Sequence, residues 1–142
     1  MKDGFIKIAC ATPELKVADC DYNSDKILEL IKEAYEKGVK IVCFPELSLT
    51  GYTCGDLFLR KELYEQTEYA LRDIKAASAD CNNLLVCVGM PIEDHGKLFN
   101  CAVYIQSGEI VGVVSKTYIP NYGEYYEKRW FVSSTCRKSD QI

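Results

Sequence analysis

The sequence predicts an α/β fold in which parallel strands and crossover helices give way to an antiparallel hairpin. Up to residue 90, short apolar runs alternate with longer segments of helical periodicity, in the order strand, helix, strand, helix, strand. That order favours parallel strands joined by helices. Residues 99–106 and 109–115 then form two strand-like runs separated by Ser107-Gly108, which is typical of a hairpin. The sheet is therefore expected to be mixed.

Three apolar runs are expected to be the parallel strands. Residues 5–11 and 39–44 each have the pattern of one strand, and Pro45 ends the second of them. Residues 84–90 are almost uninterrupted in their apolar character, which is typical of a strand covered on both faces.

Two helices are expected between these strands. Asn23 or Ser24 can cap the first helix, whose apolar stripe extends over residues 27–35. Gly38 follows it as the residue that ends the helix. The second helix covers about residues 59–79 and carries an apolar stripe of its own.

Composition and charge exclude several classes of protein. The net charge is -4 and the basic residues are scattered, which argues against a nucleic-acid partner. No apolar run reaches the roughly 20 residues that a membrane span needs. The N-terminus has neither the apolar stretch nor the cleavage site of a signal peptide. A cytoplasmic protein without a membrane partner is expected, and its length fits one domain or a piece of one.

The eight cysteines allow two interpretations. Cys10, Cys43, Cys87 and Cys101 lie inside apolar runs, where a free thiol behaves as a small hydrophobic residue. A metal or disulfide framework is the alternative, but no C-x-x-C pair exists and His95 is the only histidine. The pattern favours free, mostly buried thiols. His95 is expected to be exposed in a turn rather than catalytic.

Two charged residues stand where strands end and are candidates for chemistry. Glu46 follows the second strand, at the edge where open α/β sheets hold their sites, and apolar neighbours would make it a partly desolvated general base. Alternatively it is a loop carboxylate that faces water. Lys116 ends the hairpin and can stabilise an oxyanion, or it can be an edge-strand lysine that prevents sheet pairing. Residues 121–127 suit either a ligand-lining loop or a surface turn, and no phosphate-binding glycine motif is present.

Two long segments resemble the nitrilase, or carbon–nitrogen hydrolase, superfamily. They are residues 44–52 (Phe-Pro-Glu-Leu-Ser-Leu-Thr-Gly-Tyr) and residues 115–120 (Ser-Lys-Thr-Tyr-Ile-Pro). Residues 51–58 and 116–129 are similar to the glutaminase domain of glutamine-dependent NAD synthetases. The resemblance implies a nitrilase-type α-β-β-α sandwich with mixed sheets, of which residues 1–142 would be an incomplete N-terminal portion.

The resemblance also implies a function. In that family a Glu-Lys-Cys triad hydrolyses the side-chain amide of glutamine, and the ammonia passes to a separate ATP-dependent domain that amidates deaminated NAD. Carried over to this sequence, Glu46 is the general base and Lys116 the cation that stabilises the oxyanion. Glu124 is the second, assisting glutamate, and Tyr122 lines the glutamine pocket. No cofactor is expected in this chain, since ATP and magnesium would belong to the synthetase domain.

The sequence departs from the family in its nucleophile. The family cysteine is followed by acidic residues, whereas Cys136, the only cysteine beyond Lys116, is followed by basic ones. Cys20 precedes an acidic residue but lies too early in the chain. We therefore expect the nucleophile and the synthetase domain to lie outside these residues, the chain alone to be inactive, and its uncovered surface to favour a homo-oligomer. Three alternatives stay open: a shortened variant that uses Cys136, a stand-alone amidase for another small amide, and a non-catalytic binding module.

Overall fold

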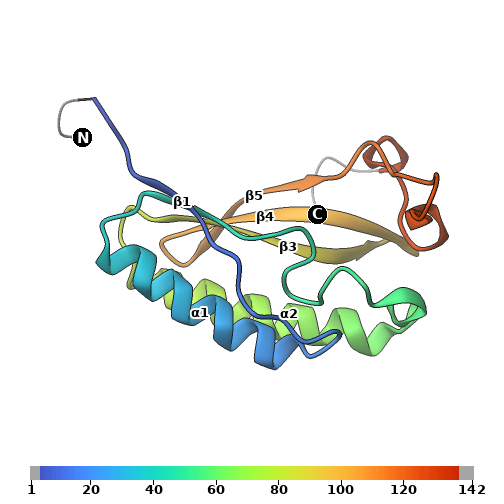
Figure 1. Ribbon diagram of the computed structural model, residues 1–142, viewed down its shortest axis with the longest axis horizontal. Helices are drawn as coiled ribbons and strands as arrows, with labels where there is room; N and C mark the ends of the chain where they lie inside the picture. Colours follow the sequence, from blue (N-terminus) through green and yellow to red (C-terminus); the bar gives the residue numbers. More distant parts are fainter. Residues whose placement is uncertain (1–3, 138–142) are drawn as a thin grey trace.

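One five-stranded mixed sheet forms the centre of the molecule. The computed structural model describes residues 4–137 of the 142-residue chain. The strands lie side by side in chain order (Figure 1). They are β1 (Ile8–Cys10), β2 (Ile41–Cys43), β3 (Leu85–Asp94), β4 (Lys97–Gln106) and β5 (Glu109–Ser115). The first three are parallel, and the β3–β4 and β4–β5 pairs are antiparallel, which confirms the predicted mixed sheet.

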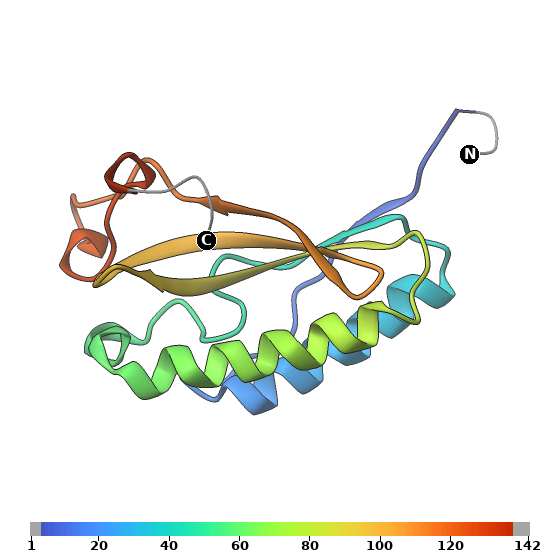
Figure 2. The same ribbon diagram turned by 180° about the vertical axis from the view of Figure 1, so that it is seen from behind.

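Two helices cross between the parallel strands. They are α1 (Cys20–Glu36) and α2 (Lys61–Ser78). Both pack against the same face of the sheet, as the views from the two sides show (Figures 1 and 2). Three short 3-10 helices lie in the loops: η1 (Gly55–Leu59), η2 (Glu127–Arg129) and η3 (Ser134–Cys136). In the described part of the chain, no helix is both long and apolar enough to cross a membrane.

The hydrophobic core lies between the sheet and the two helices. Because side chains alternate along a strand, every second residue points towards the helices. One such row crosses four strands in register and consists of Ala9, Val42, Val86 and Ile105. The last three of these side chains are fully buried. The helices supply equally buried aliphatic side chains: Ile27, Ile31 and Ile74.

Neither α-helix lies on the opposite face of the sheet (Figure 2). Ile8 on β1 and Val114 on β5 belong to this face and are 65% and 57% exposed. Where β2 ends, the loop that follows it folds over this face and lies directly on Gly89 of β3. Residues 84–90 therefore have the pattern of a strand covered on both faces, although helices cover only one of them.

The start of α1 differs from the prediction. Asp19 is the N-cap, and its carboxylate accepts a backbone N–H of the first turn. The prediction of Asn23 or Ser24 as the cap is wrong, because both are buried inside the helix. The Asn23 side chain instead bonds the backbone of Lys16 and of Leu49. Asn23 therefore joins the segment before α1 to the loop after β2, and does not cap the helix.

Strand lengths also differ from the expected ones. β1 is shorter than residues 5–11, and Phe5 is 83% exposed. β3 and β4 are longer and meet in a tight hairpin at His95 and Gly96, whose φ angles are 50° and 75°. The predicted hairpin at Ser107 and Gly108 has the same left-handed pair, with φ of 50° and 80°. Two successive positive φ angles match the twist of paired strands, and only the second hairpin was predicted.

Candidate active site

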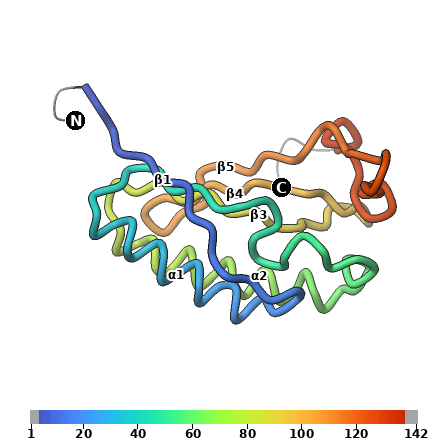
Figure 3. The backbone as a smooth tube through the Cα atoms, viewed as in Figure 1, coloured from blue at the N-terminus to red at the C-terminus, as the bar shows by residue number. Residues whose placement is uncertain are grey.

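Two loops meet at the end of the sheet where β2 and β5 stop (Figure 3). The first loop, residues 44–60, follows β2, and the second, residues 116–137, follows β5. Asp56 of the first loop accepts two hydrogen bonds from the Arg129 guanidinium, at 2.6 and 2.8 Å. It also accepts one from Trp130 Nε1 at 3.0 Å. These contacts join the loops that carry the candidate catalytic residues.

Glu46 lies in the first loop, and its side chain is 43% exposed. It faces a groove instead of being pressed between apolar neighbours, as the sequence had led us to expect. Its Oε1 accepts a hydrogen bond from Lys116 Nζ at 2.7 Å and another from the side-chain amide of Asn100 on β4. The other oxygen, Oε2, accepts no hydrogen bond from the described residues. The carboxylate is therefore fixed through one oxygen while the second can accept a proton.

The loop around Glu46 is seated on β3 by main-chain contacts. Leu49 N–H donates to the carbonyl of Gly89 at 3.1 Å, and Gly89 N–H donates to Ser48 Oγ at 3.2 Å. A Cβ atom at Gly89 would lie only 2.4 Å from the nitrogen of Leu47. Leu47 itself has a φ of 52°, in the left-handed region that residues other than glycine seldom adopt. Such backbone strain beside a charged side chain is typical of functional sites.

Lys116 directly follows β5 and lies between two carboxylates. Its N–H donates to the Asn100 carbonyl at 2.8 Å, which extends the pairing of β4 and β5 by one residue. Its ammonium donates to Glu46 at 2.7 Å and to the two oxygens of Glu127 at 3.0 and 3.1 Å. Burial opposes the charge, but these hydrogen bonds outweigh it and hold the pKa of Lys116 above its ordinary value. The side chain is thus a fixed cation and not a lysine that faces water.

Glu127 is the acidic residue that the sequence reasoning missed. It is the first residue of η2 and is 3% exposed. Its carboxylate accepts hydrogen bonds from the Tyr52 hydroxyl, at 2.6 Å, and from the Lys116 ammonium. Burial, and then the hydrogen bond to Glu127, raise the pKa of Tyr52. Glu124, by contrast, is exposed and contacts no charged partner among the described residues. Its assisting role is therefore still only a prediction.

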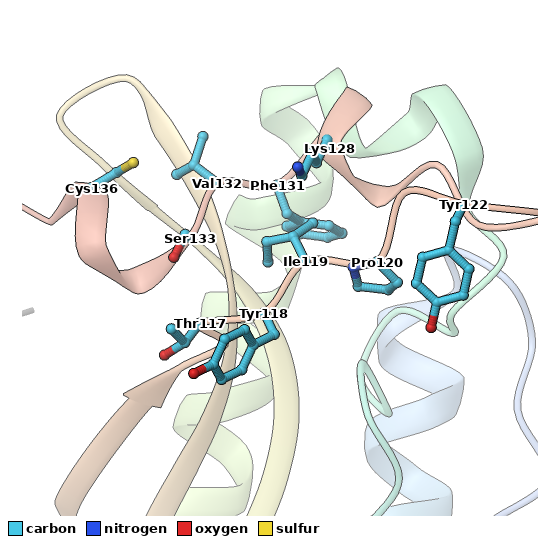
Figure 4. A pocket seen from close by; sticks show the side chains of 10 residues that line it. All are labelled: Thr117, Tyr118, Ile119, Pro120, Tyr122, Lys128, Phe131, Val132, Ser133 and Cys136. Carbon is cyan, nitrogen blue, oxygen red and sulfur yellow. The ribbon is translucent and has the colours of Figure 1, made fainter.

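Glu46 and Lys116 line one groove of about 300 Å³, together with Asn100. Tyr122 lines a different, larger hollow of about 580 Å³ (Figure 4). The two hollows share no lining residue, and Tyr122 is 72% exposed. Cys136 lies on the far side of the larger hollow from Tyr122 (Figure 4). We place the candidate chemistry in the smaller groove, because oppositely charged groups converge there.

The remaining candidates for chemistry do not gather into a site. His95 is on the β3–β4 turn with its side chain 63% exposed and its ring bonded to Asp94, so the expectation of an exposed histidine is confirmed. All eight cysteines are free thiols. Within residues 4–137, no three histidine, cysteine or acidic side chains are arranged to hold a metal ion.

Comparison with known proteins identifies the family. The profile of the carbon-nitrogen hydrolase family matches residues 7–141. The chain belongs to this family. Among curated members, the glutamine-dependent NAD(+) synthetase of Mycobacterium leprae is 37% identical over 126 residues. That match covers 89% of this carbon-nitrogen hydrolase chain and 18% of the relative, so the chain spans about a fifth of the relative's length.

Solved structures of carbon-nitrogen hydrolase relatives share the fold. A glutamine-dependent NAD(+) synthetase from Cytophaga hutchinsonii superposes with a TM-score of 0.84 at 34% identity, over 90% of this chain and 22% of that chain. An amidase from Nesterenkonia sp. AN1 superposes with a TM-score of 0.78 at 22% identity, over 91% of this chain and 50% of that one. The predicted nitrilase-type fold, present as an incomplete portion, is thereby confirmed.

Proposed function

We propose that this chain forms the part of a glutamine-hydrolysing unit that carries the general base and the cation. The complete protein would be a glutamine-dependent NAD synthetase, in line with its similarity to the Mycobacterium leprae and Cytophaga hutchinsonii enzymes. The observation that carries the proposal is the 2.7 Å contact between Glu46 and Lys116 in one groove. A general base and an oxyanion-stabilising cation have to converge on one substrate site, as these two residues from distant loops do.

The proposed chemistry is acyl transfer through a cysteine thioester. Glu46 accepts the proton of the cysteine thiol, because a thiolate and not a thiol is the nucleophile. The sulfur attacks the amide carbon of glutamine, and the Lys116 ammonium stabilises the negative charge that develops on the amide oxygen. The proton held by Glu46 passes to the leaving nitrogen, and ammonia departs. Water, deprotonated by Glu46, then cleaves the thioester and releases glutamate.

Three further residues take supporting roles in this proposal. Glu127, buried and bonded to both Lys116 and Tyr52, holds the ammonium in place while Glu46 exchanges its proton. Glu124 is proposed as a second carboxylate that assists once glutamine is bound. Tyr122 is proposed to contact glutamine from the rim of the larger hollow.

We place the nucleophilic cysteine outside these 142 residues. None of the eight cysteines is followed by acidic residues at the family position. Cys136 lines the larger hollow and not the groove of Glu46 and Lys116. The Nesterenkonia amidase, which shares the fold, has been solved with acrylamide added at an active site cysteine.

The same proposal specifies partners and location. Glutamine is the substrate of this unit, whereas ATP and magnesium would be bound by the separate synthetase domain. The uncovered sheet face, with Ile8 and Val114 exposed, supports association with a further polypeptide layer or with a second copy of the chain. We further propose a cytoplasmic protein, as expected for NAD synthesis.

A chimeric enzyme tests the proposed roles. Residues 7–131 would replace the matching segment of the Cytophaga hutchinsonii NAD synthetase, and NAD formation would be measured with glutamine and, separately, with ammonium. Glu46→Gln or Lys116→Met should each lower the glutamine-dependent rate by roughly 100-fold or more and leave the ammonium-dependent rate unchanged. The exposed pair Lys26 and Glu29, 2.8 Å apart, supplies the matched control substitutions, Lys26→Met and Glu29→Gln, which should change neither rate.

Equal rates in the Glu46 variant and the Glu29 control would refute the assigned base. The companion substitutions Glu124→Gln and Glu127→Gln decide which second carboxylate matters. For the chain alone, ammonia released from glutamine is expected to stay at background. Hydrolysis that disappears in Cys136→Ala would show instead that the nucleophile is within this chain. A chimera that hydrolyses other amides but never glutamine would favour the stand-alone amidase.

A further inference from the structure

Asn100 is a buried polar residue on β4 that contacts both candidate catalytic residues. It is 4% exposed, although asparagine is uncommon both inside strands and in protein interiors. Its main-chain carbonyl accepts the N–H of Lys116 at 2.8 Å, and its side-chain amide donates to Oε1 of Glu46. A buried amide is informative, because burying a polar group costs free energy unless that group is hydrogen-bonded. Neither the sequence patterns nor the resemblance to the carbon–nitrogen hydrolases pointed to this residue.

The contact with Glu46 determines the orientation of the Asn100 carboxamide. A carboxylate oxygen accepts hydrogen bonds and donates none, so the Nδ2 end and not the Oδ1 end has to face Glu46. Rotation of the amide by half a turn would bring two acceptor oxygens together. The Lys116 ammonium donates to the same Glu46 oxygen at 2.7 Å, which holds that oxygen in place. Oδ1 of Asn100 is therefore kept on the side of the amide that points away from Glu46 Oε1.

The Oδ1 atom of Asn100 retains the capacity to bind a ligand. It accepts no hydrogen bond from the residues that the structure describes. Within residues 4–137, Ser115 Oγ is the only fully buried side-chain nitrogen or oxygen that lacks a partner, so Oδ1 is not sealed in the interior. Asn100 lines the groove of Glu46 and Lys116 and is otherwise buried. The access that remains to Oδ1 is therefore from this groove.

The groove thus presents a hydrogen-bond donor and a hydrogen-bond acceptor side by side. Lys116 Nζ and Asn100 Nδ2 bond the same oxygen of Glu46, which makes the two side chains neighbours. A primary amide carries the complementary pair, because its oxygen accepts a hydrogen bond and its NH2 group donates one. A carboxylate, which is the product of amide hydrolysis, has two acceptors and no N–H. An acceptor at Oδ1 favours the first of these groups and disfavours the second.

We propose that Asn100 selects a primary amide as the substrate of this site. Its Oδ1 accepts an N–H of the substrate carboxamide, while Nδ2 keeps Glu46 in place. This inference rests on the proposed hydrolysis of glutamine, in which Lys116 stabilises the amide oxygen, and it requires no more access to the groove than that reaction does. When the leaving nitrogen takes up its proton it becomes more positive, so its hydrogen bond to Oδ1 strengthens. The product carboxylate meets the same oxygen without a hydrogen and is released.

The chimeric enzyme described above tests this role with two substrates, glutamine and the γ-methyl ester of glutamate. The ester has no N–H on its reacting group, so the ratio of the two kcat/KM values, amide to ester, measures recognition of the NH2 group. Both substrates are read on one preparation, and any unfolded fraction cancels from the ratio. Asn100→Leu has a similar shape but no acceptor, and it should lower the ratio by roughly 10-fold. Asn100→Asp keeps an acceptor oxygen and loses the donor to Glu46, so both rates should fall while the ratio does not.

Asn23 supplies the matched control, because it is also a buried asparagine and its amide donates to the Leu49 carbonyl in the Glu46 loop at 3.0 Å. Asn23→Leu should leave the ratio unchanged. The inference is overturned if Asn100→Leu keeps the ratio of the parent enzyme, or if the ratio falls equally in Asn23→Leu or Asn100→Asp. Glu46→Gln separates this failure from that of the proposed function. If Glu46→Gln hydrolyses glutamine as fast as the parent, the proposed function fails; if it is inactive and Asn100→Leu keeps the ratio, only the role of Asn100 fails.

Discussion

Replacing Gly89 with alanine tests whether the Glu46 loop is seated on β3 by direct main-chain contact. The added Cβ would lie 2.4 Å from the nitrogen of Leu47, 2.7 Å from the carbonyl oxygen of Pro45 and 2.9 Å from the carbonyl carbon of Glu46. All three are main-chain atoms, so no side chain can rotate to relieve the overlap. Either the loop lifts away from the sheet or β3 bends.

The expected loss of stability can be worked out from these contacts. Overpacking a filled site costs about 1–3 kcal/mol. The hydrogen bonds of Gly89 with Ser48 and Leu49, at 3.2 and 3.1 Å, would lengthen, and each contributes about 1 kcal/mol. We expect Gly89→Ala to lower the free energy of unfolding by about 2–4 kcal/mol. For a chain of this size, Tm would fall by roughly 5–15 °C.

Gly112 on β5 is the matched control, because it is also a strand glycine. A Cβ there would meet only the Cδ2 atom of Tyr104, at 3.9 Å. Gly112→Ala should raise the stability by about 0.4–1 kcal/mol, since alanine restricts the unfolded chain. Urea unfolding followed by circular dichroism measures both variants. If Gly89→Ala unfolds within about 0.5 kcal/mol of the parent chain, or if the two variants lose stability equally, the loop is not seated as described.

Three further predictions concern the charged contacts between the loops. Lys116→Met leaves the Glu127 carboxylate buried without its cation and should lower the free energy of unfolding by about 3 kcal/mol. This is the low end of the range, because the lysine side chain is 28% exposed. Adding Glu127→Gln should recover most of that loss, as measured by urea unfolding. Folding favours the neutral form of Tyr52, so the stability that its hydroxyl contributes is complete below its ordinary pKa of 10.0 and is lost as the pH rises above that value. The Tyr52→Phe variant should therefore lose less stability than the parent chain between about pH 9 and 11. The guanidinium of Arg129 and then the indole of Trp130 hold the pKa of Asp56 well below its ordinary 3.8, so its contribution is present above that value and lost as the pH falls below it; Trp130, the only tryptophan, should report this change by its fluorescence.

Each of these predictions has an outcome that contradicts it. If the Lys116→Met single variant and the double variant with Glu127→Gln are equally unstable, the cost is lost packing and not an unpaired charge. Identical alkaline profiles with and without the Tyr52 hydroxyl would show that its bond to Glu127 does not contribute. Asp56→Asn should remove the acid-dependent change in Trp130 emission below pH 4, and a change that persists in this variant would assign it to another group.

Sequence patterns were sufficient to predict which helices and strands form, but not where each one begins and ends or which residue caps it. Alternating and helical periodicities located every strand and both helices, because burial on one face imposes them. The cap of α1 could not be predicted in the same way. Asp19 and Asn23 have equal capping ability, but the Asn23 amide lies inside the helix and donates to the carbonyl of Leu49 at 3.0 Å. That contact joins residues far apart in the sequence.

The site shows the same limit. Glu46 and Lys116 were found because long segments around them resemble a known family, whereas position alone favoured a structural role for each. Glu124 and Glu127 lie in one irregular loop, and no periodicity tells which of them points inward. Contacts with the first loop orient this segment so that Glu127 points inward. Asp56 binds Arg129, and Phe58 packs on Phe131 with ring centroids 4.9 Å apart.

The unequal burial of the two carboxylates around Lys116 determines what the site can do. If the ammonium were paired with Glu46 alone, each protonation of that carboxylate would release the cation when an oxyanion has to be stabilised. Glu127 is 3% exposed, so loss of its cation would leave an unpaired charge in the interior, at a cost of about 3–5 kcal/mol. In the proposed reaction the ammonium would therefore stay with Glu127 while Glu46, with its side chain 43% exposed, takes up and releases a proton. A base and a cation can then lie 2.7 Å apart without cancelling each other, because a third, buried charge holds the cation.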